Sequence, residues 1–512
     1  MNKVIEMKGI TKVFPGTVAN DDVHFELLKG ETHVLLGENG AGKTTLMNIL
    51  YGLYQPEEGE IYVNGKPVKI NNPNDAIKLG IGMVHQHFML VHNFTVAENI
   101  VLGIEPRKGF EIDIHKAINA VKEISRKYGF DVNPNAIIDD ISVGQQQKVE
   151  ILKALYRGAE ILILDEPTAV LTPQEIEELG AIIKKLKQEG KSFILITHKL
   201  KEVMKMSDRV TIIRRGKITG VVKTAETYID ELAELMVGRK VNLTVEKGIT
   251  RVGTPILQIN NLVAIDQRGL PAVNDVNLTV NGGEILGIAG VDGNGQSELV
   301  EVLTGLRKPK SGTIRLKGKD IYGKSPREIA EYGMGHIPED RHKRGLILSY
   351  SLFENSVLGL HHRKPFSTGI RMNYKVIRNH CRRLIEEFDV RTPSDEVSAG
   401  SLSGGNQQKL IAAREIFKDP ELLIAAQPTR GLDVGAIEYI HGRLVQERDK
   451  GKGVLLVSLE LDEILALSDR IAVMYDGKIV KILSRKDADE KKLGILMAGG
   501  VLDKEKGVNE VE

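Results

Sequence analysis

A glycine-rich run near the N-terminus has the residue types and spacing of a phosphate-binding loop. The run GENGAGKT extends from Gly37 to Thr44. Its glycines let backbone amides converge on phosphate oxygens, and a following helix adds the positive end of its dipole. In such a loop we expect Lys43 to hold the β- and γ-phosphates and Thr44 to ligate Mg²⁺.

Two adjacent acids complete the chemistry that such a loop needs. Asp165 and Glu166 directly follow the apolar run Ile161 to Leu164. An aspartate at this strand end can hold Mg²⁺ through a water, and the adjacent glutamate can polarise the attacking water. Strands often end in solvated carboxylates, so these two acids alone would be weak evidence for a site. They become informative because the chain also contains the phosphate-binding loop. Together they predict a nucleotide-hydrolysing site.

The elements that must position these groups follow an α/β pattern. Thr32 to Leu36 reads as a strand that ends at the loop, and Lys43 to Leu53 as a helix. Ile161 to Leu164 and Phe193 to Ile196 are short apolar runs, as expected for strands of a parallel sheet buried on both faces. A helical pattern at Ile114, Ile118, Val121 and Ile124 indicates a helical region outside the nucleotide core.

The chain repeats itself. The segment from Ser207 to Ile218 returns from Ser468 to Ile479, an offset of 261 (468 minus 207), whereas Gly37 aligns with Gly290 at an offset of 253 (290 minus 37). The eight-residue difference predicts an insertion between these anchors. A period this long indicates a duplicated domain, not a solenoid. We expect a first module at residues 1–240, a linker at 241–254, a second module at 255–500 and a flexible tail at 501–512.

Both halves resemble the ATPase module of ABC transporters, from about residue 3 to residue 500. The resemblance implies an α/β fold of two tandem P-loop modules, each with a mixed nucleotide-binding core and a helical subdomain. It also implies that Phe14 stacks on adenine, that Gln86 senses Mg²⁺ and the attacking water, and that His198 contacts the γ-phosphate. Ser142 to Gln145 stands where this family has its signature.

The second half departs from the pattern at the catalytic positions. At the positions that correspond to Lys43, Gln86, Asp165, Glu166 and His198, the second half carries Gln296, Glu339, Ala426, Gln427 and Leu459, respectively. The counterpart of Phe14 is Gln267. These losses leave no plausible hydrolytic chemistry. The second half nevertheless keeps an intact signature, LSGGNQ from Leu402 to Gln407, and an intact Gly431-Leu432-Asp433 loop, whereas the first half has drifted at 141–145 and 169–172.

This complementary drift predicts one competent site. In the family, two modules pack head to tail, and each ATP lies between one phosphate loop and the other module's signature. The expected catalytic residues are Glu166, His198, Gln86 and Lys43, and the expected metal ligands are Thr44, Gln86 and Asp165. The expected ATP-binding residues are Phe14, Gly37, Asn39, Gly40, Ala41, Gly42, Lys43, Thr44, Thr45, Ser403, Gly404, Gly405 and Gln407.

Composition narrows the cellular setting. The formal net charge is +1, which disfavours a nucleic-acid binder, and Cys381 is the single cysteine, which fits a reducing compartment. Without a membrane-spanning run or a secretory signal, we expect a soluble, intracellular chain, peripheral at the cytoplasmic face of the cell membrane.

The resemblance implies partners and a cargo. A tandem importer ATPase works with two transmembrane permease subunits and an extracytoplasmic substrate-binding lipoprotein. The permeases are expected near Gln86 and the helical subdomain at about 88–141. Segments such as MVHQHFMLVHNFTVAENIVLG favour nucleoside import, with a monosaccharide of the ribose or galactose type as the alternative. A ribosome-associated tandem ATPase is a remoter alternative, because its linker is usually long and charged.

Overall fold

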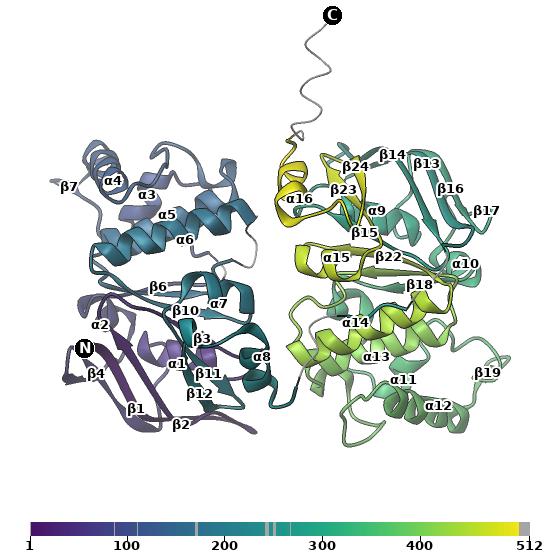
Figure 1. The fold of residues 1–512 in the computed structure, drawn as a ribbon, viewed down its shortest axis with the longest axis horizontal. Coiled ribbons are helices and arrows are strands. Elements are labelled where there is room, and N and C mark those ends of the chain that lie inside the picture. The colour runs from purple at the N-terminus through teal and green to yellow at the C-terminus, as the bar shows by residue number, and fades with distance from the viewer. Residues whose placement is uncertain are drawn as a thin grey trace, which may run out of the picture. The chain divides into compact units, whose positions relative to one another are not determined.

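The computed structural model describes residues 2–86, 88–109, 111–168, 171, 173–240, 245–248, 252–266 and 268–500. The chain divides into two compact units, Met1–Val241 and Asn242–Glu512, here called the first and second modules. Figure 1 shows that both modules combine sheets with surrounding helices.

The first module is built on two sheets. A four-stranded antiparallel sheet has the order β2 (Thr17–Leu28), β1 (Lys3–Phe14), β4 (Glu58–Val63) and β5 (Lys66–Val68). A six-stranded sheet has the order β12 (Lys217–Lys223), β11 (Arg209–Arg214), β3 (Thr32–Leu36), β10 (Ser192–Thr197), β9 (Ile161–Asp165) and β6 (Ile81–Val84). The last five of these strands run parallel, so the carboxyl ends of β3, β10, β9 and β6 meet at one edge.

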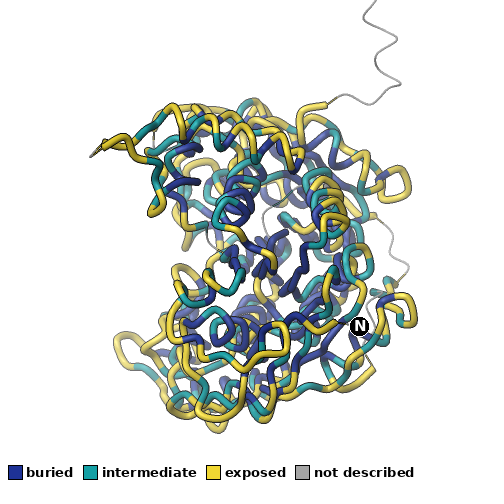
Figure 2. The backbone as a smooth tube through the Cα atoms, turned by 90° about the vertical axis from the view of Figure 1, so that its left-hand side faces the viewer, coloured by how far each residue is buried: buried dark blue, intermediate teal, exposed yellow. Residues whose placement is uncertain are grey.

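The strands of the six-stranded sheet form the centre of the first module. Every residue of β3, β9, β10 and β6 is buried, and these strands belong to the dark blue backbone of Figure 2. Burial on both faces explains why their sequences are nearly continuous apolar runs. The predicted strand at Thr32–Leu36 has the observed bounds, whereas β9 and β10 each extend beyond the predicted runs.

Helices surround this core and form a separate helical region. The helices are α1 (Lys43–Leu50), α2 (Pro73–Lys78), α3 (Val96–Val101), α4 (Ile114–Tyr128), α5 (Val143–Tyr156), α6 (Pro173–Gln188), α7 (Leu200–Met206) and α8 (Ile229–Val237). The helices α3, α4 and α5 pack together at the end of the module away from β1, β2 and β4 (Figure 1), next to the short ribbon of β7 (Arg107–Lys108) and β8 (Glu111–Ile112).

One predicted helix is shorter than expected. The sequence predicted a helix from Lys43 to Leu53, but α1 ends at Leu50. Gly52 has a φ of 82°, a left-handed conformation that glycine adopts easily, and the Leu53 amide donates back to the carbonyl of Asn48 at 2.8 Å. The last residues of the predicted helix therefore form its terminating turn.

The second module repeats both sheets. Its four-stranded sheet has the order β14 (Pro271–Asn281), β13 (Pro255–Ile265), β16 (Ser311–Leu316) and β17 (Lys319–Asp320). Its six-stranded sheet has the order β18 (Met334–Ile337), β21 (Leu422–Ala426), β22 (Gly453–Ser458), β15 (Ile285–Ala289), β23 (Arg470–Tyr475) and β24 (Lys478–Ser484). Read from its other edge, this order matches that of the first module, which confirms the α/β fold of two similar modules.

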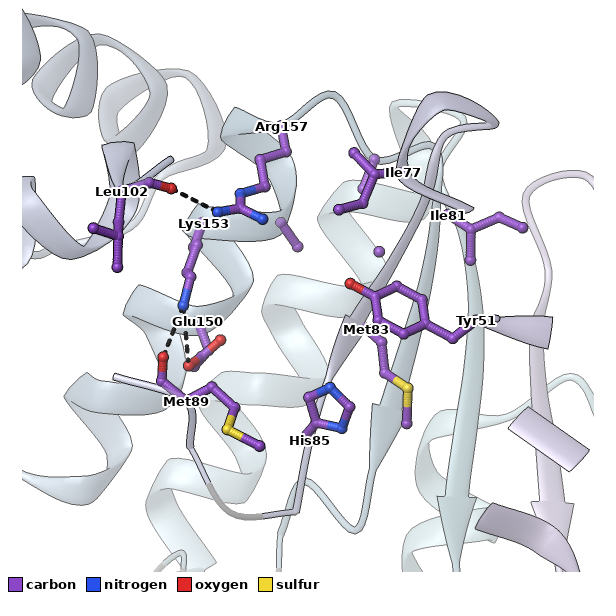
Figure 3. Close-up of a pocket in the computed structure, with 13 residues that line it drawn as sticks. Tyr51, Ile77, Ile81, Met83, His85, Met89, Leu102, Glu150, Lys153 and Arg157 are labelled. Atoms are coloured by element: carbon purple, nitrogen blue, oxygen red, sulfur yellow. Dashed lines mark hydrogen bonds and ion pairs between the residues drawn. The ribbon is translucent and has the colours of Figure 1, made fainter. Parts of the chain in front are cut away.

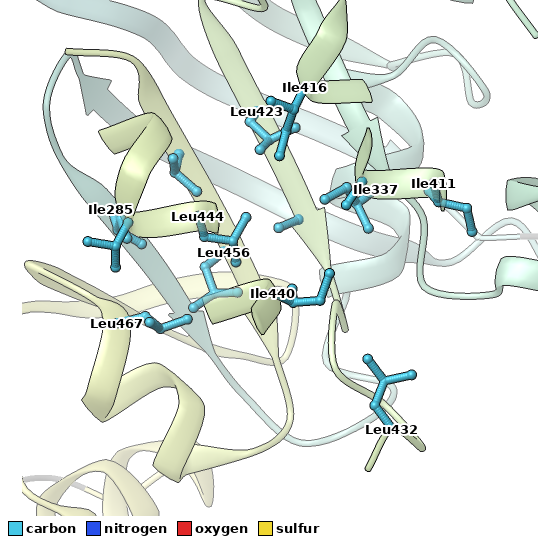
Figure 4. Packing of buried hydrophobic residues seen from close by; sticks show 14 of the residues in the cluster. Ile285, Ile337, Ile411, Ile416, Leu423, Leu432, Ile440, Leu444, Leu456 and Leu467 are labelled. Atoms are coloured by element: carbon cyan, nitrogen blue, oxygen red, sulfur yellow. The ribbon is translucent and has the colours of Figure 1, made fainter. Parts of the chain in front are cut away.

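The helices of the second module cover a large apolar core. They are α9 (Gln296–Leu303), α10 (Pro326–Glu331), α11 (Leu352–Ser356), α12 (Tyr374–Glu387), α13 (Gly404–Phe417), α14 (Val434–Asp449), α15 (Leu461–Leu467) and α16 (Glu490–Met497), with a ribbon of β19 (Ser367–Thr368) and β20 (Arg371–Met372). Ile440 and Leu444 of α14 pack with Leu456 of β22 and Leu467 of α15 (Figure 4).

The predicted insertion is divided among several places. Equivalent residues are offset by 253 at Gln86 and Glu339, and by 256 at the helix caps Thr95 and Ser351, each of which forms a capping box. The offset reaches 261 only at the signature serines. Part of the extra length therefore precedes α11, where the second module forms a π-helical turn over Arg341–Gly345.

The described part of the predicted linker lies against the second module. The Lys247 ammonium donates to the Ser468 carbonyl at 2.9 Å, and the Gly248 amide donates to Asp449 Oδ2 at 3.2 Å. The remaining linker residues 241–244 and 249–251, and the predicted tail 501–512, lie outside the described residues.

Candidate nucleotide-binding site

The glycine-rich run forms a closed turn between β3 and α1. The Lys43 ammonium is buried and donates to the carbonyls of Gly37 at 2.7 Å and Glu38 at 2.8 Å. A Cβ on Gly42 would lie 2.1 Å from the Ala19 carbonyl oxygen, and Gly42 has a φ of 103°, so only glycine fits there. The lysine therefore lies within the turn, at the N-terminus of α1, where phosphate groups bind.

The lysine is buried among acidic neighbours. Burial lowers the pKa of Lys43 below its ordinary value, while the charges of Glu166, Asp165 and Glu38 act in the opposite direction. Of the other predicted loop residues, Asn39, Gly40 and Thr44 are exposed, Thr45 is half-buried, and Ala41 and Gly37 are buried. The loop thus presents exposed residues beside a buried cation.

Asp165 ends β9 beside the loop threonine. The nearby Thr44 hydroxyl acts to lower the pKa of this carboxylate. Burial, followed by the charge of Glu166, raises the pKa of Asp165 to about 6, although the Thr44 hydroxyl and Lys43 oppose the shift. A buried carboxylate with a raised pKa lacks compensating positive charge, so a bound cation would stabilise it. Its oxygen and the Thr44 hydroxyl are the hard donors that Mg²⁺ prefers, and the site therefore fits that ion.

Glu166 is held at both of its oxygens. The Gln86 amide donates to Oε2 at 2.9 Å, and His198 Nδ1 lies 3.0 Å from Oε1. Burial acts to raise the pKa of Glu166, but the His198 hydrogen bond and the nearby positive charges outweigh it, and the pKa lies below its ordinary value. Glu166 is therefore an ionised carboxylate, as a proton acceptor must be.

The backbone at Glu166 is also unusual. Its φ of 45° lies in the left-handed region, and its amide donates to the Ile196 carbonyl of β10 at 2.9 Å. This conformation is strained for a residue other than glycine and is maintained by the surrounding sheet. It turns the chain sharply between Asp165 and Pro167, so the adjacent carboxylates of Asp165 and Glu166 have different neighbours.

The structure thus brings six predicted residues to one edge of the six-stranded sheet. They come from the start of α1 and from the ends of β6, β9 and β10, and are Lys43, Thr44, Gln86, Asp165, Glu166 and His198. Sequence reasoning missed Asn20, which is fully buried and donates to the Gly42 carbonyl at 3.1 Å. Nothing in its sequence context marks it, because the contact crosses from β2 to the loop.

Phe14 lies at the end of β1, half-buried. Its ring meets that of Tyr54 edge-on with centroids 5.4 Å apart, and the Lys12 ammonium lies 5.5 Å from its centroid. Tyr54, which follows the C-terminal end of α1, was not predicted as a neighbour of Phe14. Gln267, the second module's counterpart of Phe14, lies outside the described residues.

Each signature serine begins a helix. Ser142 caps α5 and accepts from the Gln145 backbone amide at 3.3 Å. Ser403 stands at the N-cap position of α13, where its hydroxyl accepts from the Asn406 side chain at 2.9 Å and bonds to no backbone amide of the helix. A Cβ on Gly405 would lie 3.0 Å from that of Ala436, so α13 and α14 pack closely there. The N-terminus of α13 carries no side-chain bulk at Gly404 and Gly405, which suits the approach of a phosphate.

Two residues support the signature of the second module. Gln407 is buried, and its amide donates to the Ala399 carbonyl at 3.0 Å and contacts His342 at 2.9 Å. These contacts hold the turn before α13. Asp433 caps α14 through the Ala436 amide at 2.7 Å. Residues 169, 170 and 172 of the corresponding first-module loop lie outside the described residues.

The second module keeps the backbone of the site without its chemistry. Gln427 has a φ of 47°, and its amide donates to the Val457 carbonyl at 2.7 Å, as Glu166 does in the first module. Its side chain accepts from the Leu459 amide at 3.3 Å. Ala426 ends β21 where Asp165 ends β9. Neither a base nor the equivalent metal-binding acid is present at these positions.

Comparison with known proteins defines the class of this site. The family model described as "ABC transporter" matches residues 20–169 and 273–430. The matched ranges contain the phosphate loop, the paired carboxylates and the signature of the first module, and their counterparts in the second. The chain belongs to the ABC transporter family and is an ATPase of that family.

Individual relatives match over nearly the whole chain. The nucleoside import ATP-binding protein NupA of Lactococcus lactis is 56% identical over 97% of this chain and 98% of its own length. The guanosine import ATP-binding protein NupO of Bacillus subtilis is 57% identical over 98% of both chains. The glucose import ATP-binding protein TsgD13 of Haloferax volcanii is 46% identical over 97% of this chain and 96% of its own.

Proposed function

We propose that this chain is the ATP-hydrolysing subunit that drives nucleoside import. The observation that carries the proposal is the group of residues around Glu166, held ionised beside His198, Gln86 and Lys43. Nucleoside cargo is supported by the identities of 56% to a nucleoside import protein and 57% to a guanosine import protein, against 46% to a glucose import protein. Import of a monosaccharide remains the second candidate because of that third relative.

The residues of the first module have separate chemical roles in the proposed reaction. Lys43 binds the β- and γ-phosphate oxygens, and Phe14 stacks on the adenine. Glu166 accepts a proton from the attacking water, and His198 contacts the γ-phosphate while orienting Glu166. Thr44, Asp165 and Gln86 would hold Mg²⁺, which supplies charge neutralisation of the phosphates when bound.

A second part of the proposal concerns the signature. Ser403, Gly404 and Gly405 at the start of α13, positioned by Gln407, would contact the γ-phosphate of an ATP bound at Lys43. This proposal is supported by the sequences of the two modules, because the first keeps the catalytic groups and the second keeps the signature. One chain would then hydrolyse one ATP per closure of its two modules.

Two transmembrane permeases and an extracytoplasmic binding lipoprotein are the proposed partners, with the chain at the cytoplasmic face of the membrane. No helix in the described parts of the chain combines the length and apolar character needed to cross a bilayer. The name of each relative describes an import ATP-binding protein, which supports a peripheral subunit of a larger importer.

A cavity in the first module is the proposed permease contact. It has a volume of about 210 Å³ and lies between the sheet and the helical region, lined in part by His85, Met89, Glu150 and Lys153 (Figure 3). The Lys153 ammonium donates to the Met89 carbonyl at 2.9 Å. His85 and Met89 lie on either side of Gln86 in the sequence, so a segment bound in the cavity would move the residue that contacts Glu166.

The test of the proposed function has two parts. The purified chain should hydrolyse ATP only with Mg²⁺, and Glu166→Gln should abolish turnover. The chain should then be reconstituted with candidate permeases and a candidate binding protein, and uptake of nucleosides compared with uptake of monosaccharides. Uptake of sugars alone would establish the second candidate, and ATPase activity independent of Glu166 would refute the proposed site.

A further inference from the structure

The helical region of the second module contains a concentration of positive charge. Residues 361–385, which include β19, β20 and most of α12, contain no Asp or Glu. They contain seven Lys and Arg residues, namely Arg363, Lys364, Arg371, Lys375, Arg378, Arg382 and Arg383. The segment lies at the end of the module away from β13, β14 and β16 (Figure 1). In a chain whose net charge is +1, it is a strongly basic region.

The equivalent region of the first module has balanced charge. The two ribbons correspond at an offset of 260 (371 minus 111), because β7 and β8 pair in the same register as β19 and β20. The first-module residues 101–125 carry four acidic and four basic side chains. Two of those acids, Glu111 and Asp113, have Arg371 and Asn373 as their counterparts in the second module. The basic character therefore belongs to the second ribbon and not to the fold of the region.

Three of the cations near the second ribbon have no acidic partner. The other four form ion pairs with nearby carboxylates and are Arg363, Arg378, Arg382 and Arg383. Lys364, Arg371 and Lys375 are exposed and pair with no acid in the part of the chain that the structure describes. Lys375 also lies in the first turn of α12, which contains no acidic residue. The positive end of the helix dipole therefore adds to this charge, and an anionic partner would offset both.

The tip of the second ribbon is apolar. The side chain of Ile370 is completely exposed, and Tyr374 is 57% exposed. Ser367 is buried and pairs with Met372, which packs against an apolar cluster, so this side of the ribbon faces the core. Since side chains alternate along a strand, Arg371 points away from that core. The ribbon therefore presents an apolar tip among cations on a base that is anchored by packing.

We propose that the basic ribbon, defined by Lys364, Ile370, Arg371, Tyr374 and Lys375, docks on the anionic surface of a lipid bilayer. Its cations attract the negatively charged headgroups, and Ile370 enters the boundary between headgroups and acyl chains. Tyrosine side chains are enriched at the same boundary. A polyanion such as RNA fits the cations but offers no apolar phase for Ile370. The inference rests on the proposed function only for the bilayer concerned, which is the cytoplasmic leaflet.

The experiment uses the purified full chain without permeases and without ATP. Flotation measures binding to vesicles of phosphatidylcholine that contain about 30% phosphatidylglycerol, and to vesicles of phosphatidylcholine alone. We expect binding to the anionic vesicles, weakened by high salt, and little binding to the neutral ones. Arg371→Glu, which introduces the residue type of the first ribbon, should weaken binding at least about tenfold. Ile370→Ser should also weaken binding but should leave its salt dependence unchanged.

Lys108→Glu is the matched control. It makes the same change of charge at an exposed position of the first ribbon and should leave vesicle binding nearly unchanged. The ATPase rate and the thermal unfolding of all three variants should match the wild type, because these residues lie outside the proposed catalytic site.

Several results would overturn the inference. They are no binding of the wild type to anionic vesicles, equal binding to neutral vesicles, and equal losses in Arg371→Glu and Lys108→Glu. Tight binding of RNA that Ile370→Ser leaves intact, without vesicle binding, would assign the ribbon to a polyanion instead. Because the assay needs neither ATP nor permeases, its failure is distinguishable from failure of the proposed transport function.

Discussion

His198 Nδ1 lies 3.0 Å from Oε1 of Glu166. This contact joins the ends of β10 and β9, two neighbouring parallel strands, and it contributes to the low pKa of Glu166 against the effect of burial. The two side chains therefore act as a unit, in which the histidine orients the carboxylate and keeps it ionised.

Replacing Glu166 should stop hydrolysis without stopping binding. Glu166→Gln removes the proton acceptor but keeps a similar shape and contacts, so we expect the Mg²⁺-dependent ATPase rate to fall by about 10² or more, with little change in ATP affinity. Steady-state ATPase assays and equilibrium ATP binding measure the two quantities. The matched second-module variant Gln427→Glu should leave the number of active sites unchanged, because Gln296, Ala426 and Leu459 remain.

Removing the histidine should shift the pH dependence of turnover. In His198→Ala, burial of Glu166 is no longer opposed by the hydrogen bond, so its pKa should rise, and the carboxylate should be lost as a base at a higher pH than in the wild type. The acidic limb of the kcat/KM profile should therefore move to higher pH. His198→Gln, which retains a donor, should partly restore the profile; an identical acidic limb in all three proteins would contradict the assigned role.

Asp165 should destabilise the nucleotide-free protein at alkaline pH. Burial raises its pKa to about 6 from an ordinary value of 3.8, so the folded state disfavours the ionised form. The resulting loss of folding stability is complete above the pKa that Asp165 has in the folded protein, and it disappears below the pKa that Asp165 has in the unfolded chain. Asp165→Asn should therefore raise stability at pH 8 by on the order of 1 to 3 kcal/mol and leave it nearly unchanged near pH 3.5.

Thermal unfolding of wild type and Asp165→Asn across this pH range measures the effect. The same variant should lose ATPase activity, because the Mg²⁺-binding acid is gone. A variant that is less stable than the wild type at pH 8 would show that Asp165 is not strained by burial.

The two signature serines should respond differently to the same change. Ser403→Arg blocks the N-terminus of α13, and if ATP at Lys43 needs that signature, turnover should fall by about 10² or more. Ser142→Arg alters the equivalent position of α5 in the first module and should reduce turnover much less. ATPase assays on both variants, with circular dichroism to verify folding, make the comparison. Equal losses, or full activity in Ser403→Arg, would refute the assignment of the signatures.

Restoring the lysine of the second loop should not create another active site. Gln296→Lys returns a cation to the loop, but Ala426, Gln427 and Leu459 still lack the acid, base and histidine. We expect a maximal ATPase rate close to that of the wild type, and loss of that rate when Glu166→Gln is added. Turnover that survives in the Gln296→Lys/Glu166→Gln double variant would show that the second module can hydrolyse ATP with the lysine alone.

The local chemistry was predictable from sequence because it is carried by short motifs. The glycine-rich loop before Lys43 and the apolar strand before Asp165 both depend on neighbouring residues, and the structure has a loop and a strand there. Contacts between distant segments were not predictable. The hydrogen bond from Ser297 Oγ to Glu339 Oε2 joins residues 42 positions apart, and no periodicity or propensity records it.

Other misses have the same origin. The early end of α1 depends on the left-handed Gly52, and the buried Asn20 depends on how β2 lies against the phosphate loop. Within the predicted linker, Lys247 bonds to Ser468, 221 residues later, and this contact too was not predictable from the sequence. Such positions become visible only when the tertiary contacts are known.

The number of ATP molecules hydrolysed per chain tests the asymmetric assignment most directly. Vanadate trapping with radiolabelled ATP, followed by counting of trapped ADP, reports how many sites reach the hydrolytic transition state. One competent site, built around Glu166 and completed by Ser403, predicts one trapped ADP per chain, and none in Glu166→Gln. Two trapped ADP per chain would contradict it.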